Sequence, residues 1–234
     1  MRTIKVQARI AGALYALVAL SGPIGLVYVP NELIHSGDAA ATANAIRVSA
    51  DLLRAGIASE LFHQAVEVWL VLALFRLFEP VDRHLARSMA ILGFLPIPIV
   101  FLNTLNEVAA LLLQSGVDYF SAFTSQQRDA LTMLFIRMHG MGFQVAGIFW
   151  GLWLFPFGGA IVRSAFIPRI LGYLVWLAGI GYVVEATILL VLPQFRDSVV
   201  VDIAGILDVG ELPIIFWLLL VGARGERARE ALPA

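Results

Sequence analysis

Three ionisable side chains interrupt an otherwise apolar run over residues 59–70. Glu60 and His63 are three residues apart, and His63 and Glu67 are four apart, so on a helix they form one stripe. Gln64 borders this stripe. An ionisable group at membrane depth costs on the order of 3 kcal/mol, so the stripe should face a protein interior or a wet cavity. Carboxylates and an imidazole on one helix face can bind a cation, carry protons or join neighbouring helices.

Three interpretations of this stripe are open. As a metal site, it supplies Glu60, His63 and Glu67. His139 or Glu107 from a neighbouring helix would then complete the ligand set of a zinc, iron or manganese ion. As a proton or cation relay, the stripe would use a histidine that titrates near neutral pH. As a packing device, its polar groups would hydrogen-bond across helices.

Other polar residues lie inside apolar segments and are candidates to line the same cavity. They are Asn103, Asn106, Glu107, Arg137, His139, Gln144, Glu185 and Asp208. Arg137 keeps its charge at ordinary pH and needs a carboxylate or water, and Glu107 is its first expected partner. His139 is about 200° around a helix from Arg137, so these two side chains should point to different centres.

The composition indicates a membrane protein. Of the 234 residues, 60% are hydrophobic and 14% are charged, and the mean hydropathy is +0.86, outside the range of an ordinary soluble domain. The absence of cysteine excludes disulfides, a thiol nucleophile and thiolate metal ligands. A net charge of -1 argues against nucleic acid as a partner. The lipid bilayer is therefore the expected partner, together with a small-molecule or ion ligand, while the oligomeric state stays open.

Six apolar segments are long enough to cross about 30 Å of hydrocarbon. They cover about residues 8–29, 56–78, 89–113, 128–157, 170–192 and 199–221. Asp38 is the expected N-cap of a short surface helix over about residues 38–48, which is too polar to span. Pro30 should end the first span, and Pro96 should interrupt the third. We therefore expect an all-α bundle of six transmembrane helices that forms one domain over residues 1–234.

The basic residues predict how this bundle is oriented. Eleven of them fall on the side of the chain ends: Arg2, Lys5, Arg9, Arg76, Arg83, Arg87, Arg163, Arg169, Arg224, Arg227 and Arg229. Four fall on the other side: Arg47, Arg54, Arg128 and Arg196. Because cytoplasmic loops carry the excess of Lys and Arg, we expect a cell-membrane protein with both termini in the cytoplasm and the short helix outside. Most of the polar candidates then fall in the outer half of the bilayer.

Several short stretches resemble one bacterial membrane protein family, catalogued as domain of unknown function 4386. They are ARIAG at 8–12, GDAAATA at 37–43, LLLQSGVDY at 111–119, HGMGF at 139–143, FIPRILG at 166–172 and AGIGY at 178–182. The resemblance implies a multi-helix membrane protein and no established activity. It also implies acidic residues at positions such as Glu60, Glu67 and Glu185, whereas His63 departs from the family pattern.

These observations favour small-molecule or ion binding, sensing or transport, centred on a polar cavity in the outer half of the bilayer. An intramembrane metal-dependent enzyme is the first alternative, with Glu60, His63, Glu67 and His139 as metal ligands. A membrane interaction subunit is the second alternative. The sequence leaves open whether a reaction is catalysed and whether a metal ion is bound.

Overall fold

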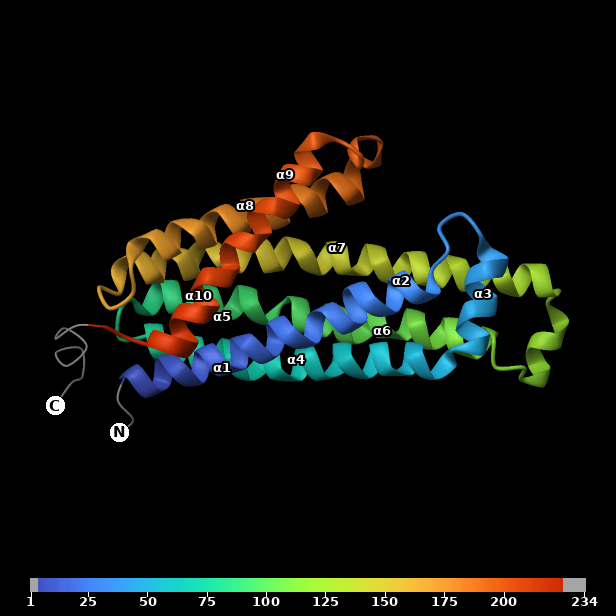
Figure 1. Cartoon of the computed structure of the whole chain (residues 1–234), viewed down its shortest axis with the longest axis horizontal. Helices are drawn as coiled ribbons and strands as arrows, with labels where there is room; N and C mark the ends of the chain where they lie inside the picture. Colours follow the sequence, from blue (N-terminus) through green and yellow to red (C-terminus); the bar gives the residue numbers. More distant parts are fainter. Residues whose placement is uncertain (1–3, 225–234) are drawn as a thin grey trace. The chain divides into compact units, whose positions relative to one another are not determined.

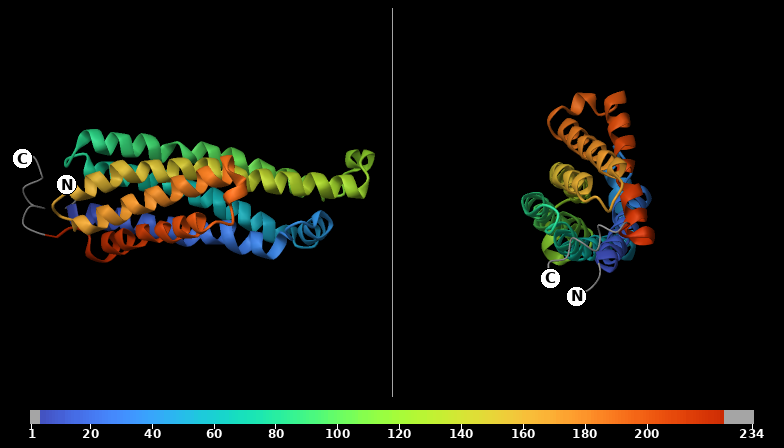
Figure 2. Two further views of the ribbon diagram at one scale, coloured as in Figure 1. Left: turned by 90° about the horizontal axis from the view of Figure 1, so that it is seen from above. Right: turned by 90° about the vertical axis from the view of Figure 1, so that its left-hand side faces the viewer.

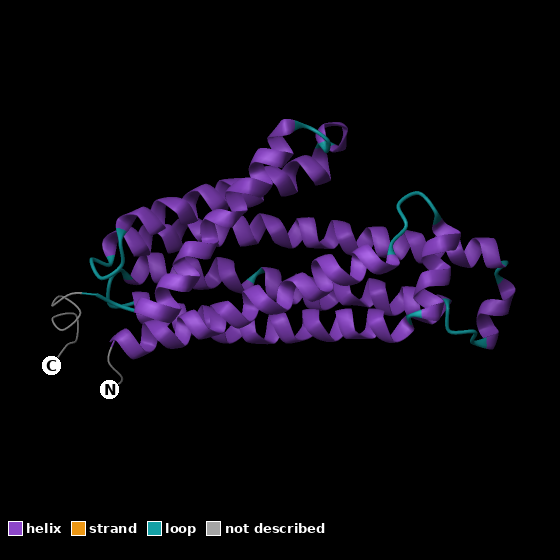
Figure 3. Ribbon diagram, viewed as in Figure 1, coloured by secondary structure: helices purple, strands orange, loops and turns teal. Residues whose placement is uncertain are grey.

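The computed structural model describes residues 4–224, which are helical apart from short turns and loops (Figure 3). No strand occurs among these residues, which confirms the all-α prediction. Both chain ends, and with them Arg2, Arg227 and Arg229 of the charge count, lie outside the described residues.

Within the described residues, six helical stretches are long and apolar enough to cross a membrane (Figure 1). They are Ile4–Leu33, Ala50–Phe78, Arg83–Leu113, Ser125–Arg163, Arg169–Val191 and Val199–Val221. Each overlaps one of the six predicted segments. The stretch Ser125–Arg163 has 39 residues, about 58 Å at the α-helical rise, so it is longer than a bilayer core is thick.

Short irregular helices divide some of these stretches. In chain order the elements are α1 (Ile4–Pro23), the π-helix η1 (Ile24–Tyr28), α2 (Val29–Leu33), α3 (Ala39–Val48), α4 (Ala50–Phe78), α5 (Arg83–Phe94), α6 (Pro96–Leu113), the 3-10 helix η2 (Asp118–Ala122), α7 (Ser125–Arg163), α8 (Arg169–Val191), η3 (Pro193–Phe195), α9 (Val199–Asp208), η4 (Val209–Glu211), α10 (Leu212–Phe216) and the π-helix η5 (Trp217–Val221).

Helix ends follow the capping and proline rules with one exception. The Asp38 carboxylate accepts a hydrogen bond of 2.8 Å from the N–H of Ala41, which confirms the predicted N-cap of α3. The predicted interruption at Pro96 is also confirmed, since α5 ends just before it and α6 begins there. The prediction that Pro30 ends the first span is wrong. Pro30 follows the π-helix η1, whose wider turn accommodates the ring, and the helix continues to Leu33.

The chain divides into two compact units, which are described separately below. Unit 1 consists of Met1–Val18, Val66–Pro98 and Gln144–Ala234, and unit 2 of Ala19–Ala65 and Ile99–Phe143. The helices α1, α4, α6 and α7 each continue from one unit into the other. That the two units form one domain stays a prediction.

Unit 1 is packed around aromatic side chains. The Phe157 ring stacks on Trp153 with 5.3 Å between centroids and meets Phe78 edge-on at 5.7 Å. Helix α8 lies beside α9 (Figure 2). Helices α7 and α8 approach closely at Gly151 and Gly179, because a Cβ on Gly151 would lie 2.8 Å from the Gly179 carbonyl oxygen.

Unit 2 has an apolar core to which five helices contribute. Its buried members are Val29, Leu33, Ile46, Leu53, Ala110 and Ile136. Ile46 belongs to α3, which lies beside α2 (Figure 1). The short helix therefore covers the apolar core of unit 2 and presents its polar side outward, as its mixed composition requires.

Candidate functional site

Three ionisable side chains meet inside unit 2. Glu60 comes from α4, Glu107 from α6 and His139 from α7. The Nε2 atom of His139 lies 3.2 Å from Oε1 of Glu60 and 3.8 Å from Oε1 of Glu107. One ligand atom from each residue can be chosen so that all three lie within 4.8 Å of one another. We call these three residues the Glu-Glu-His triad.

The triad is buried and incompletely hydrogen-bonded. The exposed fractions are 4% for Glu60, 3% for Glu107 and 8% for His139. The second carboxylate oxygen, Oε2, of both glutamates is buried without a hydrogen-bond partner among the described residues. Gln64, one helical turn after Glu60, is 1% exposed and has an equally unpaired Oε1. Buried polar groups are nearly always paired, so the unpaired oxygens of Glu60 and Glu107 beside one imidazole are available to a ligand.

Asn103 of α6 positions the imidazole. Its Nδ2 donates a hydrogen bond of 2.8 Å to the main-chain oxygen of His139, and its own main-chain oxygen lies 3.3 Å from Nδ1 of the ring. Asn106 in turn donates to Oδ1 of Asn103 at 3.0 Å. When Nδ1 carries the ring proton and donates it to Asn103, the Nε2 lone pair points toward the two carboxylates.

Two glycines make room for the side chains that build the site. A Cβ on Gly142 would lie 2.0 Å from Oδ1 of Asn103, so only glycine permits the approach of Asn103 to α7. A Cβ on Gly25 would lie 2.7 Å from Cγ of Glu60. Gly25 belongs to the π-helix η1, and such bulges often occur at functional sites.

The histidine of the predicted stripe, His63, is not a member of the triad. The Nδ1 atom of His63 is 3.2 Å from Oγ of Ser21, and its ring packs beside Gly22 of the first span. His63 is rotated about 60° from Glu60 around the axis of α4, which is enough to turn it toward a different neighbouring helix.

The remaining acidic candidates lie in unit 1. Trp150 donates a hydrogen bond of 3.2 Å to Oε1 of Glu67 through its Nε1 atom. Glu185 and Asp208 lie close enough to interact electrostatically. Gln144 of α7 also belongs to unit 1, where it is half-buried. Along α4, Glu67 is about 10 Å from Glu60, which is too far for both to bind one ion.

The expected ion pair between Arg137 and Glu107 is not formed. The Arg137 side chain is exposed, and none of the ion pairs of the described residues includes it. Glu107 instead faces His139. The predicted separation of Arg137 from His139 explains this outcome, because a helix that buries His139 turns Arg137 to the other side.

The dimensions of the triad suit a metal ion. Two donor atoms on a tetrahedral zinc with bonds of 2.0–2.1 Å are about 3.3 Å apart. The distances from Nε2 of His139, 3.2 and 3.8 Å, are close to this value, and all three ligand atoms lie within 4.8 Å of one another. Two carboxylates and one imidazole are ligands of zinc, iron and manganese, and their two negative charges balance a divalent ion.

Sequence reasoning found the members of the triad without their grouping. Glu60 and His139 were expected as metal ligands together with His63 and Glu67. Glu107 was expected both as an alternative to His139 in completing the ligand set and as the first partner of Arg137. The positioning role of Asn103 and the fit of Gly142 were missed. The motif HGMGF at 139–143 could have indicated a close approach of another side chain to this helix, because it places a glycine, Gly142, three residues after His139.

Six helices of the described residues are long and apolar enough to cross a membrane, which indicates the class of multi-pass helical membrane proteins. It belongs to the family described as Domain of unknown function (DUF4386), which matches residues 10–222, and this confirms the resemblance seen in the sequence. A protein of Archaeoglobus fulgidus described as "Uncharacterized protein" is 32% identical over 78 residues, which are 33% of this chain and 44% of that protein. The match therefore spans less than half the length of this relative. No solved structure matches the chain.

Proposed function

We propose that this protein binds a divalent transition-metal cation through Glu60, Glu107 and His139. The observation that carries the proposal is the convergence of these three buried side chains, with ligand atoms within 4.8 Å and two unpaired carboxylate oxygens. An unsatisfied buried acceptor costs about 1–3 kcal/mol, and a cation would satisfy both carboxylates at once. A pure packing device would instead be expected to pair all of its acceptors.

The proposed position of the site is near the outer edge of the bilayer. At the α-helical rise, Glu60 lies about 27 Å along α4 from its end at Phe78. Likewise, His139 lies about 36 Å along α7 from Arg163. If these two helix ends lie at the cytoplasmic surface, as the excess of basic residues supports, the triad is near the far side of about 30 Å of hydrocarbon. A cation from the extracytoplasmic side would then reach the triad without crossing the membrane.

The proposal includes the membrane arrangement: one domain in the cell membrane, both termini in the cytoplasm and α3 outside. Ion binding, sensing or transport at a polar cavity in the outer half of the bilayer is the function that this arrangement supports best. Glu60, Glu107 and His139 are its ligand residues, and Asn103 and Asn106 are positioning residues.

The test is metal binding by purified full-length protein in detergent. The protein is stripped with a chelator, equilibrated with Zn²⁺ or Mn²⁺, desalted and analysed for metal by mass spectrometry. We expect about one ion per chain, and at least tenfold weaker binding in Glu107→Gln and in His139→Gln.

His63→Gln is the matched control, because His63 lies on α4 near the triad but contacts Ser21 instead. It should retain the metal. Wild-type protein without stoichiometric metal would refute the proposal, and so would equal retention in wild type and Glu107→Gln. Circular dichroism of each variant shows whether a loss of metal reflects unfolding.

Metal-dependent catalysis is the second candidate function, and the number of ligands favours it. Three protein ligands leave at least one coordination position of zinc open for water or substrate, as in catalytic zinc sites. A metal-bound water near neutral pH would be a hydrolytic nucleophile. Loss of a hydrolytic activity in His139→Gln with retention in His63→Gln would support this candidate, whereas metal binding without any turnover would favour ion binding alone.

A further inference from the structure

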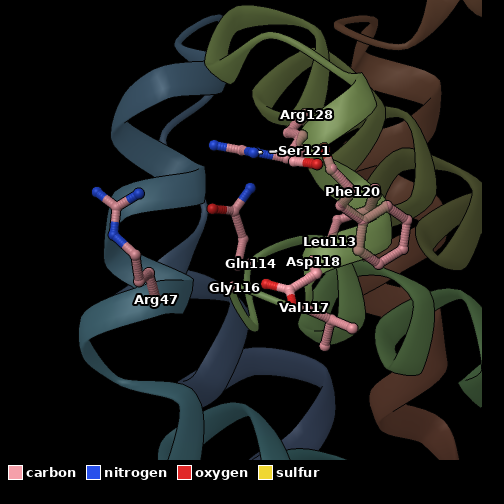
Figure 4. A pocket seen from close by; sticks show the side chains of 9 residues that line it. All are labelled: Arg47, Leu113, Gln114, Gly116, Val117, Asp118, Phe120, Ser121 and Arg128. Atoms are coloured by element: carbon pink, nitrogen blue, oxygen red, sulfur yellow. Dashed lines mark hydrogen bonds between the residues drawn. The ribbon is translucent and has the colours of Figure 1, made fainter.

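A polar pocket lies in unit 2 and shares no residue with the triad (Figure 4). Its volume is about 170 Å³. Arg47 of α3 and Arg128 of α7 line it, with Gln114 just after α6 and Asp118 and Ser121 of η2. Two parts of the chain that are distant in the sequence, α3 and the stretch 113–128, therefore bring two positive charges, one negative charge and an amide to one small cavity.

Neither arginine of this pocket is neutralised by a protein carboxylate. Arg47 donates to Oδ1 of Asn44 at 2.7 Å, and Arg128 lies 3.4 Å from the main-chain oxygen of Phe120. The ion pairs formed within residues 4–224 do not include them. By contrast, Arg54 on the neighbouring α4 pairs with Asp51 at 2.7 Å.

The carboxylate of Asp118 is also kept apart from both guanidinium groups. Opposite charges that line one small cavity attract each other, but Arg47 and Asp118 are exposed, and no ion pair joins Asp118 to either arginine among the described residues. Figure 4 shows the Gln114 amide between Arg47 and Asp118. The Nε2 atom of Gln114 donates to Oγ1 of Thr132 at 2.9 Å, which fixes this amide in place. The fold thus keeps the charges of the pocket separated.

We propose that this pocket binds a small zwitterion, a molecule with an anionic oxygen group and an ammonium group a few ångströms apart. The guanidinium groups of Arg47 and Arg128 bind the carboxylate or phosphate, for which Arg is the preferred residue. The Asp118 carboxylate binds the ammonium group. A free amino acid and the phosphoethanolamine head group of a lipid both carry this chemistry.

The test is isothermal titration of the purified full-length protein in a non-ionic detergent, which has no charged head group that could occupy the pocket. The probes are glycine, glutamate and phosphoethanolamine, with acetate as the anion alone and ethylamine as the cation alone. We expect at least one zwitterion to bind about tenfold more tightly than both single-charge probes, which corresponds to 1.4 kcal/mol. Tightest binding of phosphoethanolamine identifies a lipid head group, and tightest binding of an amino acid identifies a free solute.

Three variants separate the pocket from general surface charge. Arg128→Gln should weaken zwitterion binding about tenfold. Asp118→Asn should remove the preference for the zwitterion over acetate. Arg54→Gln is the control and should change nothing, because that guanidinium already pairs with Asp51. Equal affinity for acetate and the zwitterions, no binding of any zwitterion, or equal weakening in Arg128→Gln and Arg54→Gln would each overturn the proposal.

Discussion

Gly142 offers a sharp test of how Asn103 holds the imidazole of the triad. In Gly142→Ala the new Cβ would lie 2.0 Å from Oδ1 and 2.3 Å from Cγ of Asn103, so the Asn103 side chain must move. It cannot move freely, because its amide donates to the main-chain oxygen of His139 and accepts from Asn106. Overpacking costs about 1–3 kcal/mol and a lost hydrogen bond about 1 kcal/mol, against a gain of about 1 kcal/mol for alanine in a helix. The net expectation is destabilisation by about 2 kcal/mol.

Gly140→Ala is the matched control on the same helix. No atom lies within 4 Å of the position that its Cβ would take, so alanine should stabilise α7 by up to about 1 kcal/mol. The two variants should differ by about 3 kcal/mol, which for a chain of this size separates their midpoints of thermal unfolding by roughly 6–12 °C. Thermal unfolding in detergent measures this difference. A Gly142→Ala protein that unfolds at or above the temperature of Gly140→Ala would refute the described packing of Asn103.

Three further predictions concern charge and topology. Arg137→Gln should change the free energy of unfolding by less than about 0.5 kcal/mol, because Arg137 is exposed. A large loss of thermal stability in this variant would show that Arg137 is held in a buried ion pair after all. The N–H of Leu85, followed by the Arg163 guanidinium, holds the pKa of Asp82 below its ordinary value of 3.8. The ionised Asp82 carboxylate therefore stabilises the folded protein at pH values above 3.8, and this stabilisation is lost as the pH falls through the lowered pKa. The difference in unfolding temperature between wild type and Asp82→Asn should narrow in acid, and a difference that stays constant with pH would contradict the lowered pKa. In intact cells, an impermeant thiol reagent should label Gln126→Cys and spare His84→Cys, and labelling of both would reverse the orientation.

The six spans could be read from the sequence because each one depends only on its own composition. A run of about 20 apolar residues is a local property, and so are the cap at Asp38 and the break at Pro96. Pro30 was misjudged because the π-turn before it has no signature in a single sequence. Whether the helix ends or continues at Pro30 depends on the geometry of the preceding turn as much as on the proline itself.

The candidate site was only partly predictable, since it depends on which helix faces which. The spacing of Glu60 and His63 fixes their angle around α4 but leaves open which neighbours they meet. Glu60 meets Glu107 and His139, whereas His63 meets Ser21. Glu60 and His63 differ by a rotation of about 60° around the axis of α4, and this rotation is enough to give them different neighbours. No local sequence pattern predicts such a contact, because it depends on how the helices pack and joins residues that are 36 to 79 positions apart in the sequence.

The measurement that tests the metal centre most directly is pulsed electron paramagnetic resonance of the Mn²⁺-loaded protein. A histidine nitrogen bound to Mn²⁺ modulates the electron spin echo, and the spectrum therefore reports whether a histidine is a ligand. The chain has four histidines, and only His139 belongs to the triad. We predict a nitrogen modulation in wild type that persists in His63→Gln and disappears in His139→Gln. A modulation that survives His139→Gln, or that is absent from metal-loaded wild type, would contradict the assignment of the site.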